Sequence, residues 1–283
     1  MTRAPLRLVR PSGRVNAARF ASNHGEPDTT HCAAAASDFS TVAIATLDYE
    51  LSPLGDRALL IHLGDTIDDA THRRVRAVCA RLDARPVPGM IEIVPAFASV
   101  AVHYEPGRVA DDALGSRWRS PYERLVESMH VALADLEDSE LPTPREVTIP
   151  VCYGDSYGPD LGDVASQHEL TPREVVALHS GGTYNVYMLG FAPGFAYLGG
   201  LPPEIATPRR AEPRTAVPAG SVGIGGSQTG IYPLLLPGGW QLIGRTPLRM
   251  FDARREPATL LAVGDRVRFT SITSDEFQRL ASA

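Results

Sequence analysis

The chain has 283 residues and a net charge of −6, with 43% hydrophobic and 21% charged residues. This composition predicts a globular protein that buries a substantial core in one or two domains. The acidic excess argues against nucleic acid as a partner, because phosphate binding needs a basic surface. No apolar run approaches the roughly 20 residues that cross a bilayer, so we expect no membrane-bound form.

All 27 basic residues are arginine, and the sequence contains no lysine. The absence of lysine excludes a Walker-type phosphate loop, Schiff-base chemistry and a biotinyl-lysine on this chain. The three cysteines, Cys32, Cys79 and Cys152, are far apart and form no CxxC pair or zinc-like Cys/His cluster. We therefore expect a reduced, cytoplasmic protein without a metal site.

Residues 1–40 lack the pattern of a folded domain. Five arginines and no acidic residue occur in the first 25 positions, which faintly resembles a transit peptide. The alanine run at 33–36, with polar neighbours, favours a disordered or non-domain extension instead.

Residues 41–141 alternate between strand and helix patterns. We expect strands at 41–51, 57–63, 90–94 and 98–104, and amphipathic helices at 67–83 and from Pro121 to about Leu136. Ser120 followed by Pro121 is typical of a helix start. The order ββαββα predicts a small α+β N-terminal domain with helices on one face of a sheet. Pro142-Thr143-Pro144 is the expected linker.

Residues 145–275 follow a different pattern. A strand at 146–152 and a helix from Thr171 to about His179 precede a glycine-dense region, since 14 of the 25 glycines lie between Gly181 and Gly244. Apolar stretches predict strands at 185–189, 217–224, 231–236 and 240–243, and a closing hairpin of 260–263 with 267–269 around Gly264-Asp265. Short strands with Gly/Pro turns predict a compact, mostly-β barrel or sandwich.

Two glycine-rich segments are candidates for ligand binding. Segment 190–200 is interpreted either as a shaped loop that presents aromatic rings and backbone N–H groups, or as a tight barrel connection. Segment 220–230 has the composition of an anion-binding loop. It lacks GxGxxG spacing and is flanked by strands, so a β-turn system is the alternative interpretation.

Polar side chains supply further candidates. Arg209, Arg210 and Arg214 lie in Pro-rich sequence, and Arg245 follows Gly244 at a strand end. Arginine binds carboxylate or phosphate groups in a bidentate manner, although a single arginine is also typical of a solvated surface. The candidates for proton transfer are His179, Asp160, Tyr184, Tyr187 and Asp252. His179 is equally explained as a residue favoured by a helix C-terminus.

The same segments carry a family resemblance. The motifs are Tyr153-Gly154, Gly158-Pro159-Asp160-Leu161, Leu178-His179, Tyr187-Met188-Leu189-Gly190-Phe191, Pro193-Gly194-Phe195, 217–222, 228–233, 237–240, 243–247 and Phe251-Asp252. In this order, over about residues 47–272, they resemble the family of the B-type subunit of 5-oxoprolinase, also known as the Kip-type kinase inhibitor or allophanate hydrolase subunit 1 family. One departure is Ala196, where the family pattern has proline.

The resemblance implies a cyclophilin-like β-barrel after the N-terminal α+β domain. It also implies a protein that is inactive alone and acts with a homologous C-type subunit and a separate A-type subunit in the ATP-dependent opening of 5-oxoproline to glutamate. ATP, with Mg²⁺ and a site shared with the C-type subunit, is the implied cofactor, and the substrate is a small anion. On the motif positions, the expected catalytic residues are His179, Asp160 and Tyr187. The expected substrate- or phosphate-binding residues are Arg209, Arg214, Arg245, Ser221, Gln228, Thr229, Phe191 and Phe195.

Two other functions agree with the same resemblance. One is inhibition of a sensor histidine kinase by binding its helical dimerisation region. The other is a carboxyltransferase that acts on urea-like amides, for which the biotin carrier would have to be another chain. Prolyl isomerase activity is suggested by fold analogy alone, which is a poor guide to function.

Overall fold

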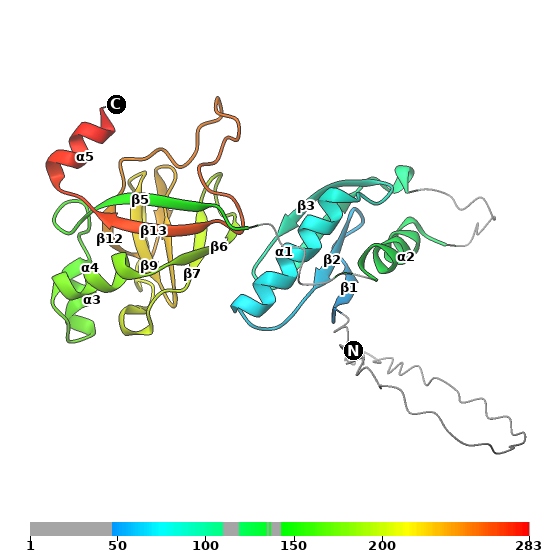
Figure 1. Cartoon of the computed structure of the whole chain (residues 1–283), viewed down its shortest axis with the longest axis horizontal. Helices are drawn as coiled ribbons and strands as arrows, with labels where there is room; N and C mark the ends of the chain where they lie inside the picture. The colour runs from blue at the N-terminus through cyan, green and yellow to red at the C-terminus, as the bar shows by residue number, and fades with distance from the viewer. Residues whose placement is uncertain (1–46, 110–118, 135, 137–142, 283) are drawn as a thin grey trace, which may run out of the picture. The chain divides into compact units, whose positions relative to one another are not determined.

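A computed structural model describes residues 47–109, 119–134, 136 and 143–282 (Figure 1). All of these residues belong to one compact unit, Ile44–Ala283. The extension predicted for residues 1–40 lies outside the described residues.

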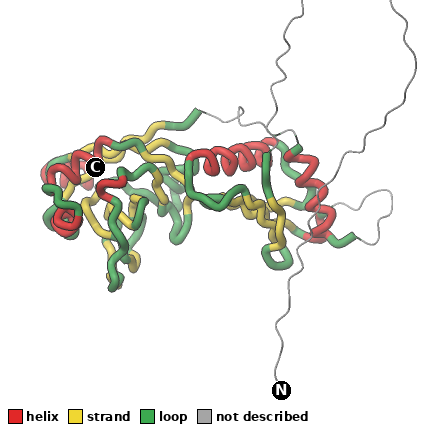
Figure 2. The backbone as a smooth tube through the Cα atoms, turned by 90° about the horizontal axis from the view of Figure 1, so that it is seen from below, coloured by secondary structure: helices red, strands yellow, loops and turns green. Residues whose placement is uncertain are grey.

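Residues 47–136 contain a four-stranded antiparallel sheet and two α-helices. The strands are β1 (Glu50–Pro53), β2 (Ala58–His62), β3 (Met90–Pro95) and β4 (Ser99–Tyr104), in the order β1-β2-β4-β3. Helix α1 (Asp69–Ala84) follows β2, and the short helix η1 (Pro106–Arg108) and helix α2 (Pro121–Leu133) follow β4. Figure 2 shows α1 running beside the strands of this sheet. The chain order of these elements is the predicted ββαββα.

Local sequence explains where these two helices begin and which face they bury. Asp68 caps α1 by accepting from the Thr71 N–H, and Ser120 forms a capping box with Glu123 at the start of α2. Pro121 occupies the first turn, where a missing N–H costs no hydrogen bond. The buried positions recur every three or four residues and pack with the sheet in one apolar cluster, namely Val75, Val78 and Leu82 of α1 and Leu125, Met129 and Leu133 of α2.

The second half of the chain is built around a closed barrel of strands in the order β10-β7-β6-β13-β5-β12-β9. Their bounds are β5 (Glu146–Tyr153), β6 (Tyr184–Leu189), β7 (Ala196–Gly199), β9 (Ser221–Gly225), β10 (Gln228–Ile231), β12 (Gln241–Arg245) and β13 (Arg266–Ser271). A two-stranded ribbon of β8 (Arg214–Val217) and β11 (Leu236–Gly238) accompanies the barrel. The predicted mostly-β barrel is therefore confirmed.

Helices cover parts of this barrel. They are α3 (Leu161–Gln167), α4 (Pro172–Gly181), the short η3 (Pro203–Ile205) and α5 (Ser274–Ala281). The predicted helix that starts at Thr171 is confirmed as α4, and its capping box with Glu174 is present. One apolar cluster joins side chains of all the barrel strands with α3 and α4, so the main core fills the barrel and continues under these helices.

Several predicted details of the barrel are wrong. The expected strand 217–224 is divided by the turn at 218–220, and the expected strand 231–236 is mostly loop. The closing hairpin around Gly264-Asp265 does not form, because β13 pairs in parallel with β5 and antiparallel with β6. Segment 190–200 contains strand β7, and segment 220–230 is the β9–β10 hairpin. The backbone of this hairpin is paired within the sheet, which agrees with the β-turn interpretation of 220–230.

None of the helices in the described ranges combines the length and the apolar character that a membrane span requires.

Candidate anion-binding site

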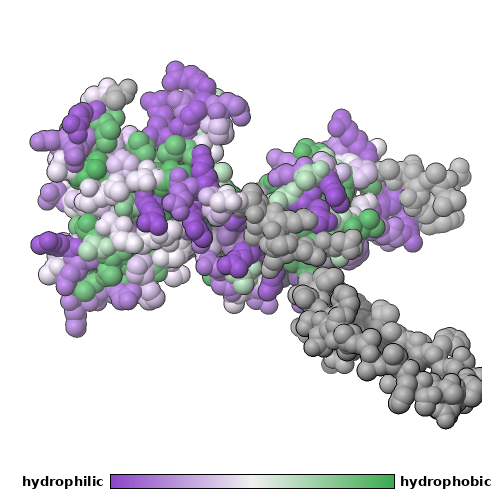
Figure 3. Space-filling model, viewed as in Figure 1, coloured by the Kyte–Doolittle hydropathy of each residue, from purple (hydrophilic) through white to green (hydrophobic). Residues whose placement is uncertain are grey.

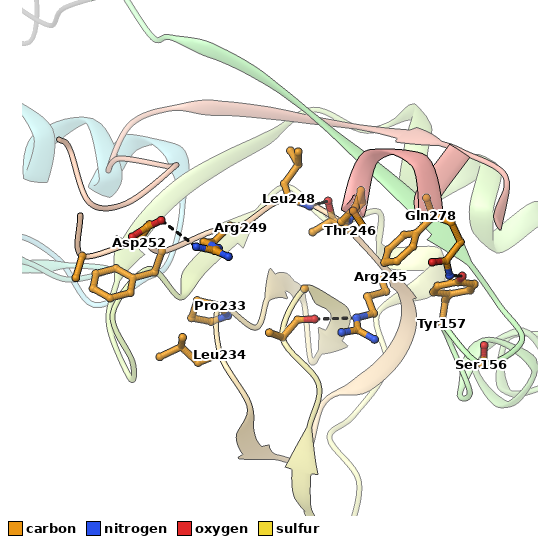
Figure 4. Close-up of a pocket in the computed structure, with 17 residues that line it drawn as sticks. Ser156, Tyr157, Pro233, Leu234, Arg245, Thr246, Leu248, Arg249, Asp252 and Gln278 are labelled. Atoms are coloured by element: carbon orange, nitrogen blue, oxygen red, sulfur yellow. Dashed lines mark hydrogen bonds and ion pairs between the residues drawn. The ribbon is translucent and has the colours of Figure 1, made fainter. Parts of the chain in front are cut away.

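A cleft of about 850 Å³ opens beside the end of β12. Its lining comes from segments that are distant in sequence: 156–157, 219–220, 233–234, 245–249, 251–253 and helix α5 (Figure 4). The volume lies within the range of about 300–1,000 Å³ that is usual for small-molecule sites. We therefore treat this cleft as the candidate site and ask which polar groups reach it.

Arg245 is the central polar residue of the cleft. In Figure 4 it lies between Pro233 and Leu234 on one side and Tyr157 on the other. Its Nε donates to the Ala219 carbonyl oxygen at 2.8 Å. Among the described residues, neither of its two terminal nitrogens has a hydrogen-bond partner. A guanidinium that is anchored at Nε and free at both terminal nitrogens is suited to a bidentate contact with carboxylate or phosphate.

The turn before β9 places this arginine. Gly220 has φ +82°, and a Cβ there would lie 2.3 Å from the Thr246 carbonyl oxygen, so only glycine fits. The Gly220 N–H donates to the Tyr232 carbonyl at 2.7 Å, and its own carbonyl accepts from the Thr246 N–H at 2.9 Å. These bonds tie three segments together at the base of the cleft and bring the Ala219 carbonyl to Arg245.

A second charged group lines the cleft but is already neutralised. Asp252 accepts a hydrogen bond from Arg249 Nη1 at 3.0 Å (Figure 4). It accepts another from the Arg254 N–H, also at 3.0 Å. The Arg254 backbone N–H and then the Arg249 guanidinium lower the pKa of Asp252 to about 2. This carboxylate is therefore ionised and paired at neutral pH, and it is poorly suited to proton transfer there.

Helix α5 forms the remaining wall. Phe277 is buried with its ring centroid 4.6 Å from that of Tyr157. The Tyr157 hydroxyl lies 3.2 Å from Ser274 Oγ and accepts from Gln278 Nε2 at 3.0 Å. The C-terminal helix is thus attached to the barrel at the residue that faces Arg245 across the cleft.

His179, expected as a catalytic residue, lies in the barrel core with no exposed surface. The Thr229 hydroxyl donates to the Gly223 carbonyl, so it accepts from His179 Nε2–H at 3.0 Å. This tautomer leaves Nδ1 to accept from the Tyr153 hydroxyl at 2.8 Å. Burial lowers the pKa of His179 to about 3. The ring is a neutral, fully hydrogen-bonded core group, an environment typical of a structural residue.

Asp160, also expected as catalytic, is a buried residue that accepts hydrogen bonds from three residues, and its side chain is 3% exposed. Its Oδ1 accepts from Arg214 Nη2 at 2.6 Å and Arg210 Nη1 at 3.2 Å, and Oδ2 accepts from the Leu242 N–H at 2.7 Å. Among the described residues, Arg214 Nη1 and Arg210 Nε are buried without a partner. The carboxylate is enclosed, whereas the side chains of Arg210 and Arg214 are 35% and 25% exposed. The cluster joins α3, β8 and β12.

Tyr187, the third expected catalytic residue, is buried and donates its hydroxyl to Asp69 Oδ1 at 3.0 Å. Burial, and then the hydrogen bond to Asp69, raise the pKa of this phenol. It does not line the cleft.

The structure separates the expected binding residues. Arg214 is bound to Asp160, and Arg209 lies over the Trp240 ring with its Cζ 5.7 Å from the ring centroid. The side chains of Ser221, Thr229 and Phe195 are buried, whereas Gln228 is partly exposed and Phe191 is 62% exposed. Of the eight binding residues expected from the family motifs, Arg245 alone lines the cleft in the described part of the chain.

Sequence reasoning missed several residues of the cleft. Thr246 and Phe251 belong to motifs that we noted, next to Arg245 and Asp252, but no role was expected for them. Tyr157, Arg249 and Gln278 stand in no pattern that indicates a site, because they come together only through the fold.

The chain matches known proteins over most of its length. The family model described as "carboxyltransferase domain, subdomain C and D" matches residues 49–261. The B-type subunit of 5-oxoprolinase from Bacillus subtilis (strain 168) is 45% identical over 82% of this chain and 96% of the relative. The corresponding protein of Escherichia coli O157:H7, which has the same name, is 43% identical over 76% of this chain and 93% of the relative. The crystal structure of TTHA0988 in space group P212121 matches with a TM-score of 0.65 and 37% identity over 77% of this chain.

These matches differ in how much of each relative they cover. The chain corresponds to nearly the whole of the Bacillus subtilis protein, but it spans only 40% of the solved TTHA0988 chain. The chain belongs to the carboxyltransferase-domain, subdomain C and D family and, within it, to the family of the B-type subunit of 5-oxoprolinase.

Proposed function

We propose that this chain is the B-type subunit of an ATP-dependent 5-oxoprolinase, which opens 5-oxoproline to glutamate together with A-type and C-type subunits. The observation that carries the proposal is the 45% identity to a protein named as this component of 5-oxoprolinase, over 96% of that protein. We also propose that the barrel is cyclophilin-like and that the chain has two domains, at residues 41–141 and 145–275. We expect the protein to act in the cytoplasm.

The chemistry explains the need for ATP. A five-membered lactam is a poor electrophile, and its ring nitrogen is a poor leaving group. Transfer of the γ-phosphoryl group to the amide oxygen releases ADP and activates the ring carbon toward water. Attack of one water on this carbon and cleavage of the C–N bond give an acyl phosphate, which a second water hydrolyses to glutamate and phosphate. One ATP and two waters are therefore consumed per ring opened. Such a reaction needs groups that hold anionic oxygens in place.

The cleft supplies one such group. The substrate carboxylate and the phosphates of ATP are both anions that the two free terminal nitrogens of Arg245 would bind. Apolar side chains of Pro233, Leu234 and Phe251 provide walls for the uncharged part of a ligand. The described residues contain no group of three or more His, Cys, Asp or Glu placed to hold a metal. We expect Mg²⁺ to enter with ATP, because proteins usually hold this ion with one or two carboxylates together with substrate phosphates.

The same cleft lacks a group for proton transfer near neutral pH. Asp252 is paired with two arginines, and within the described residues no histidine lines the cleft. This composition supports the proposal that the isolated chain is inactive and that other subunits provide the remaining groups.

Reconstitution tests the function. We expect no turnover of 5-oxoproline by the isolated chain, and turnover after addition of the purified A-type and C-type subunits. We also expect 5-oxoproline to stimulate ATP hydrolysis by the complex. If a stable complex formed but its rate of ATP hydrolysis did not change on addition of 5-oxoproline, the proposal would be contradicted. That result would favour the kinase-inhibitor or carboxyltransferase alternatives.

Replacement of arginines tests the site. Arg245→Ala should lower kcat/KM of the complex about 100-fold, which is the scale for loss of one preorganised group that binds a charged ligand. Arg173→Ala, at an exposed position on α4, is the matched control and should leave turnover unchanged. Equal turnover by both variants would remove Arg245 from the site, without bearing on the reconstitution result.

A further inference from the structure

The chain carries four arginines between the end of β12 and the start of β13. They are Arg245, Arg249, Arg254 and Arg255. In Figure 1 the loop that connects these two strands projects from the barrel, and Figure 3 shows mostly hydrophilic residues (purple) on it. The four arginines differ in how many of their donors the fold uses. This difference separates an arginine that stabilises the loop from one that is available to a ligand.

Arg255 is an arginine that the fold uses. Its guanidinium donates to four backbone carbonyls at distances of 3.1–3.4 Å, namely those of Arg249, Met250, Pro257 and Ala258. Across the same loop, the Asp252 N–H donates to the Ala258 carbonyl at 2.9 Å. These bonds tie the two halves of the loop together, so the backbone that carries Arg249 and Asp252 is held in place.

Arg249 lines the cleft with most of its donors unused. Its Nη1 donates to Asp252 Oδ2 at 3.0 Å (Figure 4), and among the described residues its Nε and Nη2 have no hydrogen-bond partner. The side chain is 65% exposed, and an exposed arginine without a partner has many rotamers. Asp252 restricts this freedom, because its own carboxylate is fixed by the Arg254 N–H. Asp252 therefore holds the Arg249 guanidinium beside the cleft.

Two guanidinium groups with spare donors thus line one cleft, since Arg245 is bonded only at Nε. Among the described residues of the lining, the charged side chains are Arg245, Arg249 and Asp252, and this carboxylate is already paired. One guanidinium is enough to bind one carboxylate or one phosphate group in a bidentate manner. A second guanidinium with free donors therefore indicates a ligand that has more than one anionic group.

The size of the cleft points to the same ligand. 5-Oxoproline is a compact five-membered ring with one carboxylate, so it would use one arginine and fill a small part of about 850 Å³. Clefts of this volume usually hold ligands of the size of a drug molecule. A nucleoside triphosphate has that size and several anionic groups in a row. The lining residues Tyr157, Pro233 and Leu234 provide a surface for its uncharged base.

We propose that Arg249, oriented by Asp252, is the second anion-binding residue of the cleft, and that Arg245 and Arg249 together bind the phosphates of a nucleoside triphosphate rather than the carboxylate of 5-oxoproline. The inference rests on the proposed function and deepens it, because it assigns the cleft to one of the two substrates. Arg249 is a binding residue in this proposal. Asp252 is a positioning residue, which acts through Arg249.

Steady-state kinetics of the reconstituted complex distinguish the two substrates. Arg249→Gln should raise the KM for ATP about 10-fold, the effect of losing a hydrogen bond to a charged group. The kcat and the KM for 5-oxoproline should not change, because only the binding of ATP is weakened. Arg254→Gln is the matched control. Arg254 Nε also contacts Asp252, at 3.4 Å, but its side chain is 84% exposed and does not line the cleft. Its kinetic constants should equal those of the wild type.

A double substitution tests the role of Asp252. Asp252→Asn alone should raise the KM for ATP about 3-fold, the scale of an exposed ion pair. In the Arg249→Gln background, the same substitution should have no further effect, because Asp252 acts through Arg249. An equal effect in both backgrounds would overturn the positioning role, since a structural role does not depend on Arg249.

Each outcome for Arg249 decides the proposal. An increase in the KM for ATP alone, with normal constants in the control, supports it. An increase in the KM for 5-oxoproline overturns it, because the cleft then holds the smaller substrate. Wild-type constants in Arg249→Gln, or the same change in Arg254→Gln, also overturn it, and the proposed function stays intact in all three cases. A wild-type complex that does not turn over 5-oxoproline contradicts the proposed function itself.

Discussion

Two polar clusters in the barrel, one at His179 and one at Arg245, differ in whether the fold already satisfies them. Both ring nitrogens of His179 are bonded to core hydroxyls, and the residue is wholly buried. Arg245 is bonded at Nε, while its two terminal nitrogens remain free among the described residues and face a cleft. A polar group that is fully paired inside the fold stabilises it, whereas one with spare donors at a cleft is available to a ligand.

The largest expected effect is on stability, at His179. His179→Ala would leave a cavity in the core and remove the partners of Tyr153 and Thr229. We expect a loss of about 3–5 kcal/mol in the free energy of unfolding, measured by urea denaturation. If His179→Ala kept its stability but abolished turnover in the reconstituted complex, His179 would be a functional residue and not a structural one.

Asp160 should give the next largest effect. Asp160→Ala would leave Arg210, Arg214 and the Leu242 N–H without their shared acceptor. We expect a loss of about 3 kcal/mol in the free energy of unfolding, because two partly exposed guanidinium groups and a buried N–H lose their acceptor. Asp160→Asn, which keeps one oxygen acceptor, should lose less. Equal stability of both variants and the wild type would show that this cluster does not hold the fold.

The pH dependence of stability tests whether His179 is neutral in the folded core. Burial lowers the pKa of His179 to about 3, whereas an unfolded histidine titrates near 6.5. As the pH falls from 6.5 toward 3, the unfolded chain gains a proton that the folded chain does not bind, so stability falls. The contribution of this residue approaches about 1.4 kcal/mol per pH unit. His72, whose pKa is lowered to about 4 mainly by burial, acts in the same direction above pH 4.

Urea denaturation at several pH values between 6.5 and 4.5 checks this prediction. His179→Gln, which does not titrate, should show a shallower loss of stability with falling pH than the wild type, whatever its absolute stability. Identical slopes would mean that His179 is protonated as readily in the folded chain as in the unfolded one.

Much of the fold could be predicted because it depends on local sequence. Helices α1, α2 and α4 start at caps that the sequence displays, and the apolar spacing gives their buried faces. The parallel pairing of β13 with β5 could not be predicted, because the two strands are more than 110 residues apart in the chain. The pattern near Gly264 therefore suggested a local hairpin that does not exist.

The glycines of segment 220–230 allowed two interpretations, an anion-binding loop or a β-turn system. Gly225 and Gly230 both lie in the paired strands of the β9–β10 hairpin. A Cβ on Gly225 would lie 2.6 Å from the Trp240 ring, and one on Gly230 would lie 2.9 Å from it. These glycines make room for an indole on the barrel rather than for a ligand. The sequence shows that Gly225 and Gly230 have no side chain, but it does not show that the Trp240 ring occupies the space beside them.

The candidate site was predicted at Arg245 and Asp252 but not at its other residues, again for a physical reason. His179, Asp160 and Arg245 occur in equally distinctive motifs, so the motifs give no information about which polar groups the fold buries. Burial and pairing depend on which distant segments meet, as Tyr153 and Thr229 meet at His179.

Arg245→Ala should have the smallest effect on stability. This substitution tests most directly whether Arg245, unlike His179, is dispensable for the fold. Arg245→Ala removes the hydrogen bond from Nε to the Ala219 carbonyl, at a site open to solvent. We expect a loss of at most about 1 kcal/mol in the free energy of unfolding. Arg214→Ala is the matched comparison, because it removes the shortest contact to buried Asp160 and should cost about 3 kcal/mol. If the two variants were equally destabilised, the free donors of Arg245 would belong to the fold, and the loss of turnover in Arg245→Ala would no longer indicate a ligand.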